Sequence, residues 1–162
     1  MQLFPYKQET FVLPYTADEA LKRMRVHTRP ISGEYEFSTN EEKRFLFNGV
    51  VKKGIFRISR RVQKPENFLP LLLGRLETTS VGSLLFVSYR LFFATAMFLI
   101  FWSVVCLLLT LFFLIYHQAW LYAGIAFGTG CVQYIIAIKN FSFQVNRSRQ
   151  ELEKVLFSKE VW

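Results

Sequence analysis

An unbroken apolar run dominates the pattern of hydrophobic and polar positions. The 48 residues from Leu91 to Ile138 contain no Asp, Glu, Lys or Arg. A helix needs about 20 apolar residues to cross a hydrocarbon core of about 30 Å, so the run is long enough for two helices. Tyr116-His117-Gln118 interrupts it. The pattern therefore predicts a hairpin of two membrane helices, over residues 91–115 and 120–138.

The residues before this apolar run contain one helical pattern and several strand patterns. Thr16-Ala17-Asp18-Glu19 has the form of a capping box, in which the threonine hydroxyl accepts from the Glu19 amide and the glutamate side chain returns. It predicts a helix over residues 17–26. The apolar stripe of this helix is Ala20, Leu21 and Met24, with Lys22, Arg23 and Arg25 facing water.

Alternation of apolar and polar residues predicts strands over residues 9–13, 34–37, 45–51, 56–62, 69–76 and 83–89. Turns are expected at 52–54 and 79–82, and a loop at 64–67. Gly49 lies inside a predicted strand, where glycine is typical of a bulge or a close approach of two backbones. These elements predict an antiparallel sheet with one amphipathic helix packed on it. The last strand enters the first membrane helix without a hinge residue.

A separate amphipathic helix is predicted after Lys139. Leu152, Val155 and Leu156 form its apolar face, and Ser148 with Glu151 forms a second capping pair. We expect this helix to pack on the sheet. The predicted fold class is an α+β membrane protein, with an antiparallel sheet, a short N-terminal helix, a C-terminal amphipathic helix and a two-helix transmembrane hairpin. Its expected parts are a cytoplasmic domain (1–90), the hairpin (91–138) and the final cytoplasmic helix (139–162).

The distribution of charge predicts the orientation. Of 20 Lys and Arg residues, 15 lie at or before Arg90 and five at or after Lys139, while the loop at 116–120 has none. Lys and Arg next to membrane spans stay on the cytoplasmic side. We therefore expect a multi-pass protein of the inner (plasma) membrane with both termini cytoplasmic.

Basic residues gather around the predicted central hairpin: Lys52, Lys53, Arg57, Arg60, Arg61 and Lys64. One interpretation is a surface for anionic lipid headgroups, where each cation near an anionic leaflet contributes about 1 kcal/mol. A nucleotide or nucleic acid could use the same charges and is the less favoured partner. Positive-inside bias and a solvated strand face would also explain them without any ligand.

Small residues in the second span suggest close helix packing. Gly124 and Gly128 are four residues apart, a spacing that lets helix backbones approach closely. They are predicted to pack either on the first span or on a second copy in a homo-oligomer. Within the spans, Cys106 and Cys131 are more typical of packing residues than of a disulfide. The absence of ionisable Asp, Glu, Lys, Arg and His there disfavours a proton relay or a transporter.

No catalytic pattern stands out. The candidate acids lack a paired histidine, a nucleophile or metal-ligand spacing; they are Glu34, Glu36, Glu41, Glu42, Glu66 and Glu77. The sequence therefore predicts no enzymatic activity, no cofactor and no metal site.

Three short motifs resemble those of a group of uncharacterised small bacterial inner-membrane proteins with two helices. They are Phe47-x-Gly49-x-Val51, Phe56-x-Ile58-x-Arg60 and Leu69-Pro70-x-x-x-Gly74-x-Leu76, followed by Gly82 and the apolar hairpin. The resemblance covers residues 45–140 and implies an inner-membrane location but no activity. The order of elements is also loosely similar to helix-grip (START-like) domains. The chain departs from that pattern in its small soluble part and in the spans placed before the last helix.

These patterns favour a non-enzymatic inner-membrane protein whose cytoplasmic domain acts by binding or assembly at the bilayer surface, with membrane lipids as its main partner. One alternative is a lipid or small-ligand module with an apolar pocket, lined by Phe37, Phe45, Phe47, Phe56 and Leu73. Another is a membrane-acting effector or its inhibitor in a conflict system.

Overall fold

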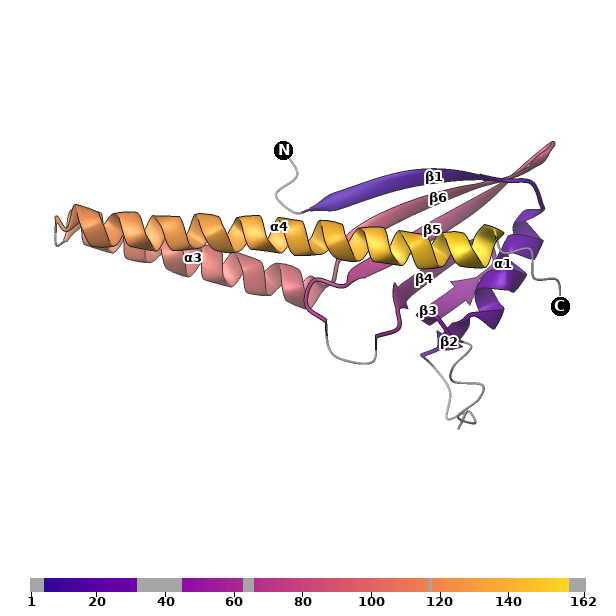
Figure 1. Ribbon diagram of the computed structural model, residues 1–162, viewed down its shortest axis with the longest axis horizontal. Coiled ribbons are helices and arrows are strands. Elements are labelled where there is room, and N and C mark those ends of the chain that lie inside the picture. Colours follow the sequence, from indigo (N-terminus) through magenta and orange to yellow (C-terminus); the bar gives the residue numbers. More distant parts are fainter. Residues whose placement is uncertain (1–4, 32–44, 63–65, 117, 158–162) are drawn as a thin grey trace.

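The computed structural model describes residues 5–31, 45–62, 66–116 and 118–157. In these residues a sheet and a pair of long helices form an elongated molecule (Figure 1). The elements in chain order are β1 (Tyr6–Leu13), α1 (Ala17–Val26), β2 (Thr28–Pro30), β3 (Phe47–Lys52), β4 (Ile55–Arg60), β5 (Pro70–Thr79), β6 (Gly82–Leu91), α3 (Phe93–Ile115) and α4 (Trp120–Phe157). The prediction of an α+β fold is confirmed. The strand expected at 34–37 lies outside the described residues.

The six strands form one sheet in the order β1-β6-β5-β4-β3-β2. Five of them pair antiparallel as expected, but β2 runs parallel to β3, which corrects the prediction of a purely antiparallel sheet. Three residues are too short to give an alternation signal. Pro30 has no amide hydrogen to donate, which suits the sheet edge that β2 occupies.

The predicted N-terminal cap is confirmed in part. The Thr16 hydroxyl accepts from the Glu19 amide at 3.4 Å, and α1 spans the predicted residues. The Glu19 carboxylate binds Arg23 at 2.9 Å, one turn along the helix. Arg23 also donates to the backbone oxygen of Leu156 at 3.2 Å, so this residue is only half-exposed and ties α1 to α4.

One face of the sheet is covered by α1 and by the C-terminal part of α4 (Figure 1). The buried stripe of α1 is the predicted one, Ala20, Leu21 and Met24. It shares a core with residues from both ends of the chain, among them Leu13, Phe47, Leu72, Leu85, Leu152, Val155 and Leu156. The apolar face that ends the chain therefore completes the core under the N-terminal sheet.

The second long helix is continuous from Trp120 to Phe157, 38 residues in all. This differs from the expectation of a separate helix starting near Ser148. No glycine or proline lies between Lys139 and Phe157, so nothing stops a helix that is already formed from extending. Ser148 is fully buried inside the helix and caps nothing.

Two helices are long and apolar enough to cross a membrane. At about 1.5 Å per residue, the 23 residues of α3 measure about 34 Å, and α4 from Trp120 to Ile138 measures about 28 Å. Only 11% of each apolar window is buried. Large apolar side chains cover the outside of the pair, such as Phe101, Leu108 and Ile125, all more than half exposed. The sheet joins α3 directly, since β6 ends at Leu91.

Candidate functional site

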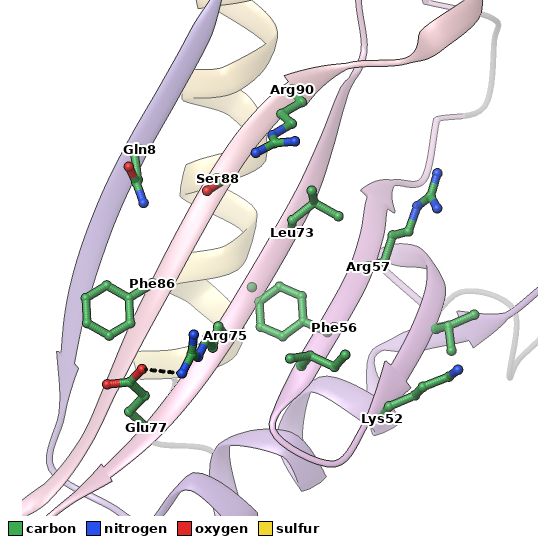
Figure 2. A pocket seen from close by; sticks show the side chains of 13 residues that line it. Gln8, Lys52, Phe56, Arg57, Leu73, Arg75, Glu77, Phe86, Ser88 and Arg90 are labelled. Atoms are coloured by element: carbon green, nitrogen blue, oxygen red, sulfur yellow. Dashed lines mark ion pairs between the residues drawn. The ribbon is translucent and has the colours of Figure 1, made fainter.

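The sheet face opposite α1 and α4 forms an open groove of about 830 Å³ (Figure 2). We call it the outer face. Side chains alternate between the two faces along each strand. In β5, Leu72 and Leu76 enter the core. The residues on the opposite face are Leu71, Leu73, Arg75 and Glu77. Within the described residues, no helix covers this face.

Apolar side chains form the centre of the outer face. Leu73 lies in the middle of β5, diagonal to the half-buried Phe86 of β6. Ile55 and Val50, on β4 and β3, are 51% and 38% exposed. The solvated face of an antiparallel sheet is ordinarily polar, so four large apolar residues on neighbouring strands are unusual there. They make a surface that could bury an apolar partner.

Three arginines surround Leu73. Arg57 is its cross-strand partner on β4, Arg75 is two residues along β5, and Arg90 is the diagonal neighbour on β6 beside Leu71. Directly opposed residues have Cβ atoms about 5 Å apart, and diagonal neighbours lie about 7–8 Å apart. In Figure 2 the Arg57 side chain points away from Leu73 and that of Arg75 points toward Glu77, so these two cations lie on either side of Leu73.

The outer face carries a clear excess of positive charge. Lys52, Arg57, Arg75 and Arg90 line the groove together with one acid, Glu77. Arg75 binds Glu77 at 3.0 Å (Figure 2). Among the described residues, neither Arg57 nor Lys52 makes an ion pair. At least two of the four cations that line the groove therefore have no acidic partner among the described residues.

At the end nearest α3, Arg90 lies over the ring of Tyr6, 5.4 Å from its centroid. The Tyr6 hydroxyl and the Ser88 hydroxyl are 3.1 Å apart. The hydrogen bond with Ser88, followed by the nearby Arg90, lowers the pKa of Tyr6 below its ordinary value. This end of the outer face therefore stabilises negative charge.

The six basic residues singled out in the sequence do not form one surface. Lys52 and Arg57 lie on the outer face, and Lys53 lies in the turn after β3. Lys64 is outside the described residues. Arg61 is half-buried beyond the end of β4, where its amide donates to the oxygen of Leu46.

Arg60 points to the opposite side of the sheet, toward α4. Its guanidinium binds Glu66 and donates to the amide oxygen of Gln144 at 2.7 Å. Arg147 of α4 also approaches Glu66, at 3.9 Å. These contacts hold α4 against β4, so Arg60 belongs to the packing of the domain.

The two glycines of the small-residue pattern face away from α3. A Cβ at Gly124 or Gly128 would meet nothing within 4 Å, whereas one at Gly130 would lie 3.1 Å from the Cβ of Cys106. Of the two predicted packing partners, α3 is therefore not the one these glycines contact. Both cysteines are free thiols.

The residues proposed for an enclosed apolar pocket separate onto two faces. Phe47 and Phe56 are 0% and 3% exposed and belong to the core, and Phe56 also lines the outer groove together with Leu73 (Figure 2). Phe45 is half-buried, and Phe37 lies outside the described residues. Among the described residues, no three His, Cys, Asp or Glu side chains gather as a metal site would require.

Sequence reasoning missed Arg75, Arg90 and Phe86 as members of the same surface. The available signal was the second apolar series on β5 and β6, Leu71, Leu73, Leu84 and Phe86, which alternates with the core residues. Comparison with protein-family models, curated proteins and solved structures gave no match. The resemblances noted from the motifs stay predictions.

Proposed function

We propose that this chain is a two-span protein of the inner membrane that acts by binding, not by catalysis, with both termini cytoplasmic. Its α+β domain stands on the bilayer, and its membrane end contacts anionic lipid headgroups. The observation behind the proposal is a pair of exposed cations, Arg90 and Lys139, where the sheet and α4 leave the apolar helical segments.

The length and surface of the helices support membrane insertion. Their apolar side chains are mostly exposed, unlike those of the core helices of soluble proteins, and neither helix lies near the N-terminus as a signal sequence would. The opposite end of the pair, between Ile115 and Trp120, contains no Lys or Arg. This asymmetry favours the orientation in which the sheet is cytoplasmic.

Lipid contact follows from the placement of Arg90 and Lys139. Arg90 precedes α3 by three positions, and Lys139 directly follows the apolar part of α4. Cations at this level lie among headgroups and gain about 1 kcal/mol each from an anionic leaflet. The structural link to the sheet is short, so this attraction also sets how the domain stands on the bilayer.

Cysteine labelling tests the orientation. Single cysteines replace Ser80 or Gln118 in a chain in which Cys106 and Cys131 are alanine. In intact spheroplasts an impermeant maleimide should modify Gln118→Cys and spare Ser80→Cys until the cells are opened. The reverse pattern would refute the orientation, and equal labelling of both sites would refute membrane spanning by the hairpin.

Lipid contact is tested on the full chain in nanodiscs of mixed phosphatidylglycerol and phosphatidylethanolamine. Native mass spectrometry should show fewer retained phosphatidylglycerol molecules for the Arg90→Gln, Lys139→Gln variant, with the difference shrinking in high salt before spraying. The matched control is Lys22→Gln, Arg25→Gln on the exposed side of α1, which should retain the wild-type number. Equal retention by both double variants would refute lipid contact at the membrane end.

A further inference from the structure

We propose that the outer face docks an acidic, amphipathic segment of another protein, seated on Leu73 and Phe86 and held by Arg57 and Arg75. The occupant presents carboxylates on either side of an apolar ridge. This inference rests on the proposed membrane placement of the sheet but not on lipid contact at Arg90 and Lys139, because the residues that hold the segment are Arg57 and Arg75.

The exposed apolar residues at the centre of the outer face favour a partner that would bury them. Leu73, Phe86, Ile55 and Val50 occupy neighbouring positions on four strands, and all remain at least partly exposed. The register makes them diagonal neighbours, with Arg57 between Val50 and Leu73 and Arg75 between Ile55 and Phe86, so apolar and cationic side chains alternate across this face. The opposite face of the same sheet is already covered by α1 and α4.

The charges on the outer face specify an anionic partner. Arg57 lies directly across from Leu73 and makes no ion pair with any described residue, and Arg75 is paired with Glu77 only. Arginine binds carboxylates through two parallel hydrogen bonds, which suits Asp and Glu side chains. A second copy docking face to face would bring the same positive surfaces together, so the charge opposes self-association here.

The position of Arg75 along the strands favours a protein over a lipid, whereas Arg57, level with Ser88, is only two residues from Arg90. Through the strand register, Arg75 aligns with Phe86, four residues beyond Arg90. At about 3.3 Å per residue, Arg75 lies about 13 Å further along the strand. The headgroup layer is only about 5–7 Å deep on each side of the hydrocarbon core. Lys52 lies at the level of Arg75, because Lys52 pairs with Ile55 and Ile55 with Arg75.

The openness of the site favours a chain segment over a small molecule. Small-molecule sites bury about 70–90% of the ligand surface in a concave pocket. The outer face is an open groove that spans five strands, from Gln8 on β1 to Lys52 on β3 (Figure 2). A segment laid across it can bury apolar side chains on Leu73 and still place carboxylates beside Arg57 and Arg75.

Photocross-linking in cells identifies the occupant. Benzoylphenylalanine replaces Phe86 in the full chain, and the control replaces Phe157, a phenylalanine of α4 that is 50% exposed and so more accessible than Phe86. The adduct is digested, and mass spectrometry locates the contacted segment. The expected result is a protein segment with more Asp and Glu than Lys and Arg, captured from position 86 only. A lipid adduct, an adduct to a second copy, a segment without acidic excess, or no adduct would each overturn the proposal.

Purified components then test the residues. The captured segment is made as a peptide and titrated against the full chain in nanodiscs of neutral phosphatidylcholine. Arg57→Gln, Arg75→Gln should raise Kd about tenfold or more, because two charge-assisted contacts are lost. Glu77→Gln should lower Kd, because it frees Arg75, and Lys22→Gln, Arg25→Gln should change nothing. Unaltered affinity of the Arg57, Arg75 variant would overturn the assignment. Failure of the lipid-retention test would leave this result intact.

Discussion

The ring of Phe56 lies over Gly74, its cross-strand partner on β5. A Cβ atom placed on Gly74 would overlap the ring. Phe56 is almost fully buried, so the glycine makes room for an aromatic residue that fills the core beside Ile58. The two residues belong to two of the three short motifs in the sequence, and their contact gives a packing reason for both.

Replacing Gly74 with alanine should therefore destabilise the domain. Overpacking a closed core costs about 1–3 kcal/mol, and we expect a value near 3 because the Phe56 ring is enclosed. Thermal melting of the full chain in nanodiscs measures the loss. Phe56→Leu should be less damaging in the Gly74→Ala background than alone, since the smaller side chain removes the clash. A loss below about 0.5 kcal/mol for Gly74→Ala, within the range of ordinary surface substitutions, would contradict this packing.

Tyr89 makes the domain sensitive to alkali. Its side chain is fully buried, and its hydroxyl donates to Glu9 at 3.3 Å. Burial first, and then the charge of Glu9, raises the pKa of Tyr89 well above the ordinary value of 10.0. The folded state therefore keeps the proton where the unfolded state loses it. The resulting stability is complete below pH 10 and is lost as pH rises above 10, by about 1.4 kcal/mol per pH unit.

Melting between pH 8 and pH 11.5 checks this dependence. Tyr89→Phe should lower the free energy of unfolding by about 1 kcal/mol at pH 8, because the hydrogen bond to Glu9 is lost. Above pH 10 its stability should decline less steeply than that of the wild type. Tyr6→Phe is the control, because the pKa of Tyr6 is shifted downward and its removal cannot flatten that decline. Parallel curves for wild type and Tyr89→Phe would contradict the assignment.

Replacing Ser148 with alanine should stabilise the protein. It is fully buried in α4 against the sheet, and its hydroxyl has no hydrogen-bond partner. An unsatisfied buried polar group costs about 1–3 kcal/mol. Ser148→Ala should therefore raise the melting temperature by more than Ser142→Ala, an exposed substitution in the same helix that gains only helix propensity, about 0.5 kcal/mol. Equal gains would show that the Ser148 hydroxyl costs nothing.

The parts of the fold that the sequence could predict depend on residues that lie close together in the chain. The cap at Thr16 and the stripe of α1 depend on residues three or four apart, and the structure contains both. The hairpins β3–β4 and β5–β6 follow from alternation and from turns near Gly54 and Gly82. The continuity of α4 was missed because Ser148 and Glu151 satisfy a capping pattern without forming a helix start.

The outer face required pairing between strands that are distant in sequence. Arg57, Leu73 and Ser88 align across β4, β5 and β6, a register that no local pattern states. The sequence indicated a basic cluster, but alternation divides Arg57 from Arg60, so one reaches the groove and the other reaches Gln144 on α4. Residues that form one basic cluster in the sequence therefore have two different positions in the structure, one in the groove and one at the contact with α4.

The final prediction concerns the shared core. Leu152 of α4 is fully buried in the same cluster as Leu72 of β5, and the two lie 80 positions apart in the chain. If α4 completes the fold of the sheet, Leu152→Ala should cost about 2–5 kcal/mol and weaken the sheet itself. Hydrogen exchange on the full chain in nanodiscs should then show faster exchange for β5 amides as well as for the end of α4. Phe157→Ala, at a half-exposed position five residues later, should leave β5 unchanged. Faster exchange confined to α4 would show that the sheet folds without the helix and would refute the shared core.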